Sequence, residues 1–297
     1  MKIIFQLVLL LICSIVFAQN TQPVSDPAFQ EISQIFGQPG KAQPDGVQKY
    51  SWPRKDLSIT ANGVRIQPGL ALGSWAAFKI IGQGKMMVMG DLVLLPTEVN
   101  PVIKALQAEG LEIHAVHNHL FGETPEIVYV HFMGHGDPEQ LANGLKNGMS
   151  KTKTPTESIN APVQLSPEIQ KEFESIQNVI GKKGNISGTV LQINVPRKET
   201  ITEDGEEVPA SMGMSIAMNF QQSGENRIAS TGDFVLVADE VNPVIKELQA
   251  HGIDVTALHT HMLKDSPHLF FMHFWANDTP ENVASGLKAA LAKINTK

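Results

Sequence analysis

The sequence predicts an α+β protein of two tandem repeats, each with a largely antiparallel sheet and a β-α-β-β-α unit. The first observation is an internal repeat, because residues 90–120 and 232–262 are identical at 18 of 31 positions without a gap. Such self-similarity sets the architecture before single elements are considered. The second observation is that both copies show the same order of strand-like and helix-like segments. The third is that apolar residues recur at helical spacing near the end of each copy.

Changes of composition divide the 297-residue chain into five segments. Residues 19–28 and 150–166 are polar, contain proline and lack apolar periodicity, which is typical of connecting segments. We therefore expect a signal peptide at 1–18, a polar leader at 19–28, repeat one at 29–149, a linker at 150–166 and repeat two at 167–297. An apolar content of 42% and a charged content of 18% are typical of globular domains.

The N-terminal segment has the three parts of a secretory signal peptide. Lys2 supplies the positive charge, residues 3–17 are apolar, and residues 16–18 form a small-residue cleavage site before Gln19. The apolar run is short for a membrane-spanning helix. We therefore expect an exported protein, periplasmic or secreted, without a transmembrane span after cleavage.

The sequence contains one cysteine, Cys13, and it lies within this N-terminal segment. A lipoprotein signal needs a small residue before its cysteine, and Ile12 fits that position poorly, so lipoprotein anchoring is the less favoured alternative. The exported chain would then have no disulfide and no thiolate. Any metal site in it must use nitrogen and oxygen ligands.

The first half of each repeat contains a helix and extended segments. We expect the helix at residues 29–36, with extended segments at 56–66 and 70–81. Asn62-Gly63 is a turn signal between the extended segments, and the second copy has Asp204-Gly205 at that point. The opening helix of the second copy is expected at residues 173–180.

The second half of each repeat supplies the β-α-β-β-α unit. A strand at residues 86–95 leads to a helix that we expect to begin near Asn100, since Asn is a good N-cap and Pro101 suits a first turn. Two strands at 111–120 and 127–133 follow as a hairpin. The closing helix begins after Asp137-Pro138, or after Thr279-Pro280 in the second copy.

Three histidines recur at the same places in both copies. Side chains two residues apart in a strand point to one face, so His117 and His119 share a side. If the following strand pairs so that His119 faces His131, three imidazoles converge within cross-strand distance. Neutral imidazole is a common ligand for zinc, and copper also accepts it. We therefore expect a metal site in each repeat, made by His117, His119 and His131 and by His259, His261 and His273.

A structural role for these histidines is the alternative, because a histidine at the end of a buried strand is often a hydrogen-bonded core residue. Drift between the copies favours a functional role: Asn118 corresponds to Thr260 and His114 to Thr256, whereas the three histidines are unchanged. Recent duplication with conserved packing would also explain that pattern.

Carboxylates and arginines retained in both copies are further candidates. Glu98 and Glu240 are candidate catalytic bases beside a metal, or else acids that favour the first turn of a helix. Arg54 and Arg197 are candidate substrate-binding groups for an anion, or else parts of a solvated strand edge. Three retained acidic pairs could complete a metal site: Asp91/Asp233, Glu98/Glu240 and Glu123/Asp265.

The sequence also argues against several functions. A net charge of −7 gives no reason to expect nucleic acid as a partner. The chain lacks a Walker A loop, a Rossmann fingerprint, a GxSxG elbow, an HExxH motif and an EF-hand loop. The expected partner is therefore a small molecule or a metal ion.

The motifs together resemble one known family. Glu98-Val99-Asn100-Pro101, the triplet His117-Asn118-His119, Pro125 and His131-Phe132, with their second copies, are similar to the LppY/LpqO family. That family comprises bacterial exported proteins and lipoproteins built on a domain of unknown function. The chain departs from the pattern at His259-Thr260-His261. The resemblance implies export and duplication but no mechanism.

The leading hypothesis is an exported metal-binding protein, with zinc first and copper second, that is either a metal-dependent enzyme such as a hydrolase or a metal-handling protein. The alternative is a non-catalytic module that binds a ligand or partner and in which the histidines are structural.

Overall fold

The computed structural model describes residues 26–156 and 163–297. The expected signal peptide, most of the polar leader and part of the linker lie outside the described residues. Within these two ranges, no helix is both long and apolar enough to cross a membrane.

Repeat one contains the expected helices, but its first half differs from the expected strands: the six-residue strand Gln48–Pro53 was not predicted, and the expected extended segment 56–66 contains only two short strands. Its elements are α1 (Pro27–Phe36), β1 (Lys41–Ala42), β2 (Gln48–Pro53), β3 (Thr60–Ala61), β4 (Val64–Arg65), α2 (Pro68–Ala71), β5 (Gly73–Gly82), β6 (Lys85–Leu94), α3 (Pro96–Ala108), β7 (Glu112–His117), β8 (Glu123–Thr124), β9 (Val128–Gly136) and α4 (Pro138–Met149).

Repeat two follows the same order, with a 3₁₀ turn in place of α2. Its elements are α5 (Pro167–Ile180), β10 (Asn185–Ser187), β11 (Val190–Pro196), β12 (Thr202–Glu203), β13 (Glu206–Glu207), η1 (Ala210–Met212), β14 (Ser215–Gly224), β15 (Arg227–Leu236), α6 (Ala238–Ala250), β16 (Asp254–His259), β17 (Asp265–Ser266), β18 (Phe270–Asp278) and α7 (Pro280–Leu291).

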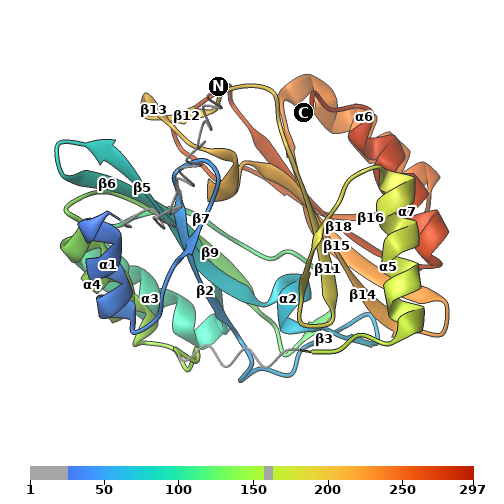
Figure 1. Cartoon of the computed structure of the whole chain (residues 1–297), viewed down its shortest axis with the longest axis horizontal. Coiled ribbons are helices and arrows are strands. Elements are labelled where there is room, and N and C mark those ends of the chain that lie inside the picture. Colours follow the sequence, from blue (N-terminus) through green and yellow to red (C-terminus); the bar gives the residue numbers. More distant parts are fainter. Residues whose placement is uncertain (1–25, 157–162) are drawn as a thin grey trace, which may run out of the picture.

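The described strands form two equivalent six-stranded antiparallel sheets. Sheet one has the order β1-β2-β5-β6-β9-β7, and sheet two has the order β10-β11-β14-β15-β18-β16. Each repeat also contributes a small three-stranded sheet, β4-β3-β8 or β13-β12-β17. The predicted α+β class, with two similar halves and largely antiparallel sheets, is confirmed (Figure 1).

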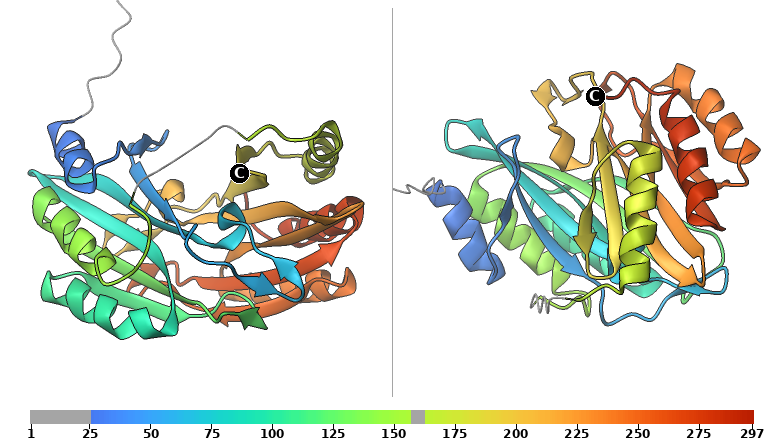
Figure 2. Two further views of the ribbon diagram at one scale, coloured as in Figure 1. Left: turned by 90° about the horizontal axis from the view of Figure 1, so that it is seen from below. Right: turned by 45° about the vertical axis from the view of Figure 1, so that its right-hand side comes forward.

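Helices cover the outer face of each sheet. In repeat one, Phe36 of α1 and Leu141 of α4 share a buried core with Phe78 of β5 and Phe132 of β9. In repeat two, helices α5, α6 and α7 form the equivalent core with alternate residues of β11, β14, β15 and β18. Figures 1 and 2 show the two helical layers on opposite sides of the molecule, with the strands between them.

The inner faces of the two sheets are buried against each other and against segments of the opposite repeat. Met87 and Met133 of sheet one lie in one cluster with Phe271 of sheet two and with Met212 and Met214 of repeat two. A second cluster joins repeat-one residues, among them Ile59, Leu70 and Tyr129, to Trp275 of sheet two. Each repeat therefore completes the core of the other.

Two expected helix boundaries are wrong. Helix α3 begins at Pro96 rather than near Asn100, because Pro96 occupies the first turn and Glu98 accepts a hydrogen bond from the backbone nitrogen of Leu95 at 2.9 Å. Pro101 lies inside the helix. Helix α5 begins at Pro167, after the Ser166 cap, rather than at Phe173. The caps at Asp137 and Thr279 are confirmed.

Candidate metal centre

The histidines of each repeat lie on the inner face, in a row of side chains that runs across the sheet. In repeat one, Trp75 pairs with Asp91, Asp91 with His131, and His131 with Ala115. In repeat two, the equivalent row contains Ala217, Asp233, His273 and Ala257. A carboxyl group and an imidazole therefore lie next to each other near the middle of each sheet.

The expected pairing of His119 with His131 is wrong. Ala115 lies opposite His131, and His117 lies opposite Tyr129. A register shift between Ile113 and Ala115 and the end of β7 at His117 leave His119 beyond the strand. Its ring stacks on Tyr129, with centroids 3.3 Å apart. The histidines reach one another through the turn after β7 rather than through ladder pairing.

Each expected set of three histidines is brought together, with ligand atoms within 4.8 Å of one another, but the two sets are not separate in space because they interleave. The ring centroids of His117 and His259 are 3.7 Å apart. The same separation, 3.7 Å, is found for His119 with His273 and for His131 with His261. Burial of the two inner faces against each other therefore produces one shared cluster of six imidazoles.

The cluster has approximate two-fold symmetry. Exchanging the repeats converts the pair His119–His273 into the pair His261–His131, and the two centroid separations are equal. The separations within the repeats agree as well, since His117 and His119 are 5.0 Å apart and the equivalent His259 and His261 are 4.7 Å apart. The local axis passes between His117 and His259.

Ligand atoms in the cluster converge closely enough to hold a metal ion. Two groups have one ligand atom per residue, all within 4.8 Å of one another: His117, His259, His261 and His273, and His117, His119 and His131. His117 belongs to both groups and lies at the centre of the cluster. The first group contains histidines from both repeats, so neither repeat alone supplies this set.

Several buried polar atoms of the cluster have no hydrogen-bond partner among the described residues. They are Nε2 of His117, His119, His131 and His273, Nδ1 of His259, and Oδ1 of Asp91 and Asp233. Buried polar atoms are normally paired, so this concentration requires an explanation. His273 shows one, because its Nδ1 donates to the Gly232 carbonyl at 3.0 Å and leaves Nε2 as a free acceptor. That arrangement is the usual one for a metal-ligating histidine.

Burial keeps the imidazoles neutral. Desolvation lowers the pKa of His117 to about 4 and that of His259 to about 3. It lowers the pKa values of the other four histidines well below the usual 6.5, and neighbouring imidazoles lower them further. A neutral imidazole is the form that binds a metal ion.

The pKa values of the two carboxyl groups beside the imidazoles shift in the opposite direction, upward. Burial raises the pKa values of Asp91 and Asp233 well above the usual value, and the proximity of Asp91 raises that of Asp233 further. An oxygen of Asp91 lies 3.8 Å from Nε2 of His131, and an oxygen of Asp233 lies 3.9 Å from Nδ1 of His273. These separations exceed hydrogen-bond length, so each carboxyl group lies beside an imidazole without bonding to it.

The cluster is reached through an open cleft of about 1400 Å³ between the two repeats. Asp91, His131, Asp233 and His273 line it together with residues of β2, β5, β11 and β14. A small molecule in the cleft would therefore contact the carboxyl groups and several of the histidines at once.

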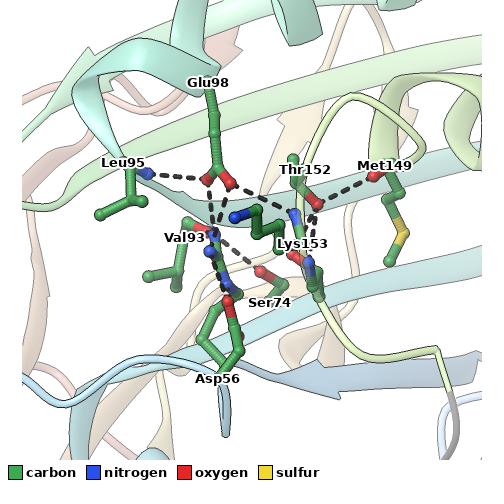
Figure 3. Close-up of polar contacts among 10 residues, drawn as sticks. Asp56, Ser74, Val93, Leu95, Glu98, Met149, Thr152 and Lys153 are labelled. Atoms are coloured by element: carbon green, nitrogen blue, oxygen red, sulfur yellow. Dashed lines mark hydrogen bonds and ion pairs between the residues drawn. The ribbon is translucent and has the colours of Figure 1, made fainter.

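Arg54 and Glu98, expected to bind substrate and to act as a base, bind each other. Figure 3 shows Glu98 among the surrounding polar contacts, with Leu95 and Lys153 beside it. Arg54 is fully buried, which contradicts a solvated strand edge. It donates to Glu98 and to the Val93 carbonyl, both at 2.7 Å, and pairs with Asp56 at 2.9 Å. Glu98 also accepts from the backbone nitrogen of Lys153 at 3.2 Å. The pair fixes the start of α3 and the segment after α4.

Arg197 and Glu240 repeat this arrangement. Arg197 donates to Glu240 at 2.5 Å and to the Val235 carbonyl at 2.7 Å, and pairs with Glu199 at 3.0 Å. Glu240 accepts from the backbone nitrogen of Asn295 at 3.0 Å. These contacts support a structural role in both copies, and the catalytic and substrate-binding roles remain predictions that no contact with the histidine cluster supports within the described residues.

Sequence reasoning missed the cleft and two residues in its wall, Lys49 and Trp75. The available signal was the alternation of polar Lys49 and Ser51 with apolar Tyr50 and Trp52, which is typical of a half-buried strand. The merging of the two histidine sets had no signal in the sequence.

Together these features define a class: a duplicated α+β protein whose halves share a histidine cluster on their buried inner faces. The chain belongs to the family described as "Domain of Unknown Function (DUF1259)", whose model matches residues 30–151 and 174–293. The match supports a duplicated domain of unknown function. The resemblance to the LppY/LpqO family remains a prediction.

Other comparisons add little. No curated protein matches the chain in sequence. One similar solved structure is that of a trimeric bacterial microcompartment shell protein, PduB, at 10% identity over 85% of this chain and 89% of that chain, with a TM-score of 0.22. A likeness at this TM-score says nothing about the function.

The metal-free protein should lose stability on acidification. A histidine with a lowered folded-state pKa binds a proton more readily when unfolded, so stability falls as pH drops below about 6.5. With a pKa of about 4, His117 alone should cost about 2 kcal/mol between pH 7 and pH 5. Asp91, Asp233 and Glu123 act in the opposite direction, because burial raises their pKa values, but six histidines have lowered pKa values. Denaturant unfolding at the two pH values measures the change.

The control for this prediction is His117→Asn, which removes one titrating group and should make the loss on acidification smaller. Equal free energies of unfolding at pH 7 and pH 5 for the wild type would contradict the neutral, buried state of the cluster.

Replacement of Arg54 should destabilise the fold. Arg54→Met leaves the buried carboxylate of Glu98 and the exposed carboxylate of Asp56 without their cation, and loss of the cation beside Glu98 should cost about 3 kcal/mol or more. Arg65→Met, a change of the same type at an exposed arginine, should cost less than about 0.5 kcal/mol. Chemical denaturation compares the two variants. If Arg54→Met is as stable as the wild type, the structural role is wrong and the substrate-binding prediction gains support.

Proposed function

We propose that this is an exported metal-binding protein that holds a transition-metal ion, zinc first and copper second, at a site shared by its two repeats. The observation that carries the proposal is the convergence of neutral, buried imidazoles: five of the six have a ring nitrogen without a hydrogen-bond partner within the described part of the chain, and Nε2 of His259 pairs with Nε2 of His261 at 2.7 Å. Export rests on the N-terminal sequence alone.

The donor set fits zinc. Zinc accepts four nitrogen ligands at about 2.0–2.1 Å in tetrahedral geometry, so the nitrogens lie about 3.3 Å from one another. The nitrogens of His117, His259, His261 and His273 lie within 4.8 Å of one another, so small ring rotations would bring them to that spacing. Copper is the second choice, because imidazole also suits copper and the described residues offer no cysteine ligand.

Placement beside an open cleft favours a reactive site over a closed structural one. A zinc ion there would polarise a bound oxygen and lower the pKa of a bound water. Asp91 and Asp233 lie beside the imidazoles, and burial raises the pKa of each, which favours a protonated carboxyl group that can donate to a bound molecule. Metal-dependent hydrolysis is the reaction class that these groups support best.

Ring stacking is the observation that favours the alternative function, a non-catalytic binding module in which the histidines are structural. His119 stacks on Tyr129, and His261 stacks on Phe271 with centroids 3.9 Å apart, as packed core residues do. In a non-catalytic binding module these contacts would be sufficient to explain the cluster. The two functions differ in whether the protein takes up a metal ion.

Calorimetric titration of the chelator-treated protein with Zn²⁺ tests the proposal. We expect uptake of about one ion per chain and a rise in melting temperature, since a ligand of the folded state stabilises it. His117→Ala and His259→Ala, one from each repeat, should each weaken uptake at least about 100-fold, because loss of a ligand should cost no less than loss of an outer-sphere partner.

His251→Ala is the matched control, because His251 is exposed at the end of α6 and should leave uptake unchanged. Absence of uptake of Zn²⁺ and Cu²⁺ by the wild type would contradict the proposal and leave the binding module. Two ions in the wild type, with one retained in each variant, would contradict the shared site.

A further inference from the structure

The two walls of the cleft differ although the repeats are otherwise alike. Lys49 pairs with Ala77 in sheet one, and the equivalent pair in sheet two is Gln192 with Asn219. Trp75, next to Asp91, corresponds to Ala217, next to Asp233. Repeat one therefore contributes a cation and an aromatic ring where repeat two contributes neither.

In the cleft wall from repeat two, the two polar side chains at these positions already form hydrogen bonds within the protein. The side-chain amide of Gln192 donates to the Gly69 carbonyl at 2.7 Å. The side-chain amide of Asn219 donates to the Leu70 carbonyl at 2.9 Å. Both bonds hold α2 of repeat one against sheet two, so the role of these amide groups is to stabilise the fold.

The ammonium group of Lys49 has a different environment. Its Nζ lies 3.8 Å above the ring of Trp75, which attracts the cation and holds it in the cleft wall. Among the described residues, no carboxylate lies within ion-pairing distance of it. Asp91 and Asp45 are close enough to raise the pKa of Lys49, but neither forms an ion pair with it, and Asp45 accepts from the backbone nitrogen and hydroxyl of Ser211, at 3.0 and 2.6 Å.

Lys49 is partly buried, which makes its charge unfavourable without an anion nearby. Lys49 loses much of its hydration, and its pKa falls to about 8. Buried charges are normally paired. The cleft that Lys49 lines is large enough to admit a small molecule beside it. The second binding group that such a molecule would meet is the row of Asp91 and His131.

The spacing of the strands sets the size of the ligand. Lys49 is on β2 and Asp91 is on β6, with β5 between them, so the two backbones are about 10 Å apart. The long side chain of Lys49 spans part of that distance. An anionic group a few ångströms across fits in the remainder.

We propose that the cleft binds a small organic anion, a carboxylate or a phosphate, whose charged group lies between Lys49 and the shared histidine cluster. This proposal deepens the proposed function, because it names the class of ligand that meets the metal site. Lys49 recognises the negative charge, and Trp75 positions the ammonium group. Neutral molecules of the same shape are discriminated against.

Calorimetry on the zinc-loaded full chain tests this with three probes: benzoate, phenylphosphonate and the neutral benzyl alcohol. At least one of the two anions should bind, and benzyl alcohol should bind at least about 10-fold more weakly. The two anions distinguish a carboxylate ligand from a phosphate ligand. Lys49→Met should weaken binding of the preferred anion about 10-fold or more, and Lys49→Arg should retain most of it.

Lys55→Met is the matched control, because Lys55 lines the same cleft and the variant loses the same charge. It should change anion affinity less than about 3-fold if Lys49 makes the specific contact. Equal affinity of the wild type and Lys49→Met, equal loss in both lysine variants, or equal affinity for benzyl alcohol would each overturn the proposal, as would failure of both anions to bind.

Zinc uptake measured on the same samples separates this proposal from the proposed function. Lys49→Met should take up zinc as the wild type does. If the wild type takes up no zinc, the metal site fails, and the anion proposal is then decided by whether the metal-free protein binds an anion in a manner that depends on Lys49.

Discussion

In each repeat, helices cover only the outer face of the six-stranded sheet. The rest of the structure depends on how the uncovered inner face is buried. The opposite face carries apolar side chains such as Met87, Met133 and Phe271, whose exposure to water would be unfavourable. The two repeats solve the problem together. Their inner faces are buried against each other, and the segments around α2 and η1 cross to the opposite repeat. Because the histidines and Asp91 and Asp233 lie on these same faces, the burial that stabilises the fold also assembles the cluster.

The histidine cluster lowers the stability of the fold that contains it. An unpaired buried polar group costs roughly 1–3 kcal/mol, and several imidazole nitrogens and carboxyl oxygens of the cluster are unpaired within the described residues. Apolar side chains in these positions would make a more stable core. Retention of all six histidines and both aspartates through the divergence of the two copies is therefore better explained by a bound species that uses the lone pairs. The same reasoning applies to Lys49, whose charge is held in the cleft wall with no carboxylate within ion-pairing distance among the described residues.

Local patterns in the sequence predicted the local structure well. The gapless repeat, the caps at Asp137 and Thr279 and the positive-φ turn at Asn62-Gly63 all follow from residue chemistry, and the structure shows each of them. The register of β7 against β9 was not predictable, because the shift between Ile113 and Ala115 depends on packing rather than on periodicity. Nor did the sequence indicate that the two sets of histidines would merge, because each repeat contains all three histidines of a possible metal site. Arg54 and Glu98 show another limit: an arginine and an acid retained in both copies look the same whether they bind a ligand or each other.

The resulting picture is a duplicated protein in which the duplication itself forms the site. Neither sheet alone brings together His117, His259, His261 and His273, and the cleft that reaches them has walls from both repeats. Drift at Lys49 and Trp75 then made the two walls unequal without disturbing the cluster. Anomalous X-ray diffraction at the zinc absorption edge, from crystals of the zinc-loaded protein, tests the shared site most directly. The account predicts one anomalous peak within bonding distance of histidine nitrogens from both repeats. A peak ligated by the histidines of one repeat alone, or zinc bound only away from the cluster, would contradict it.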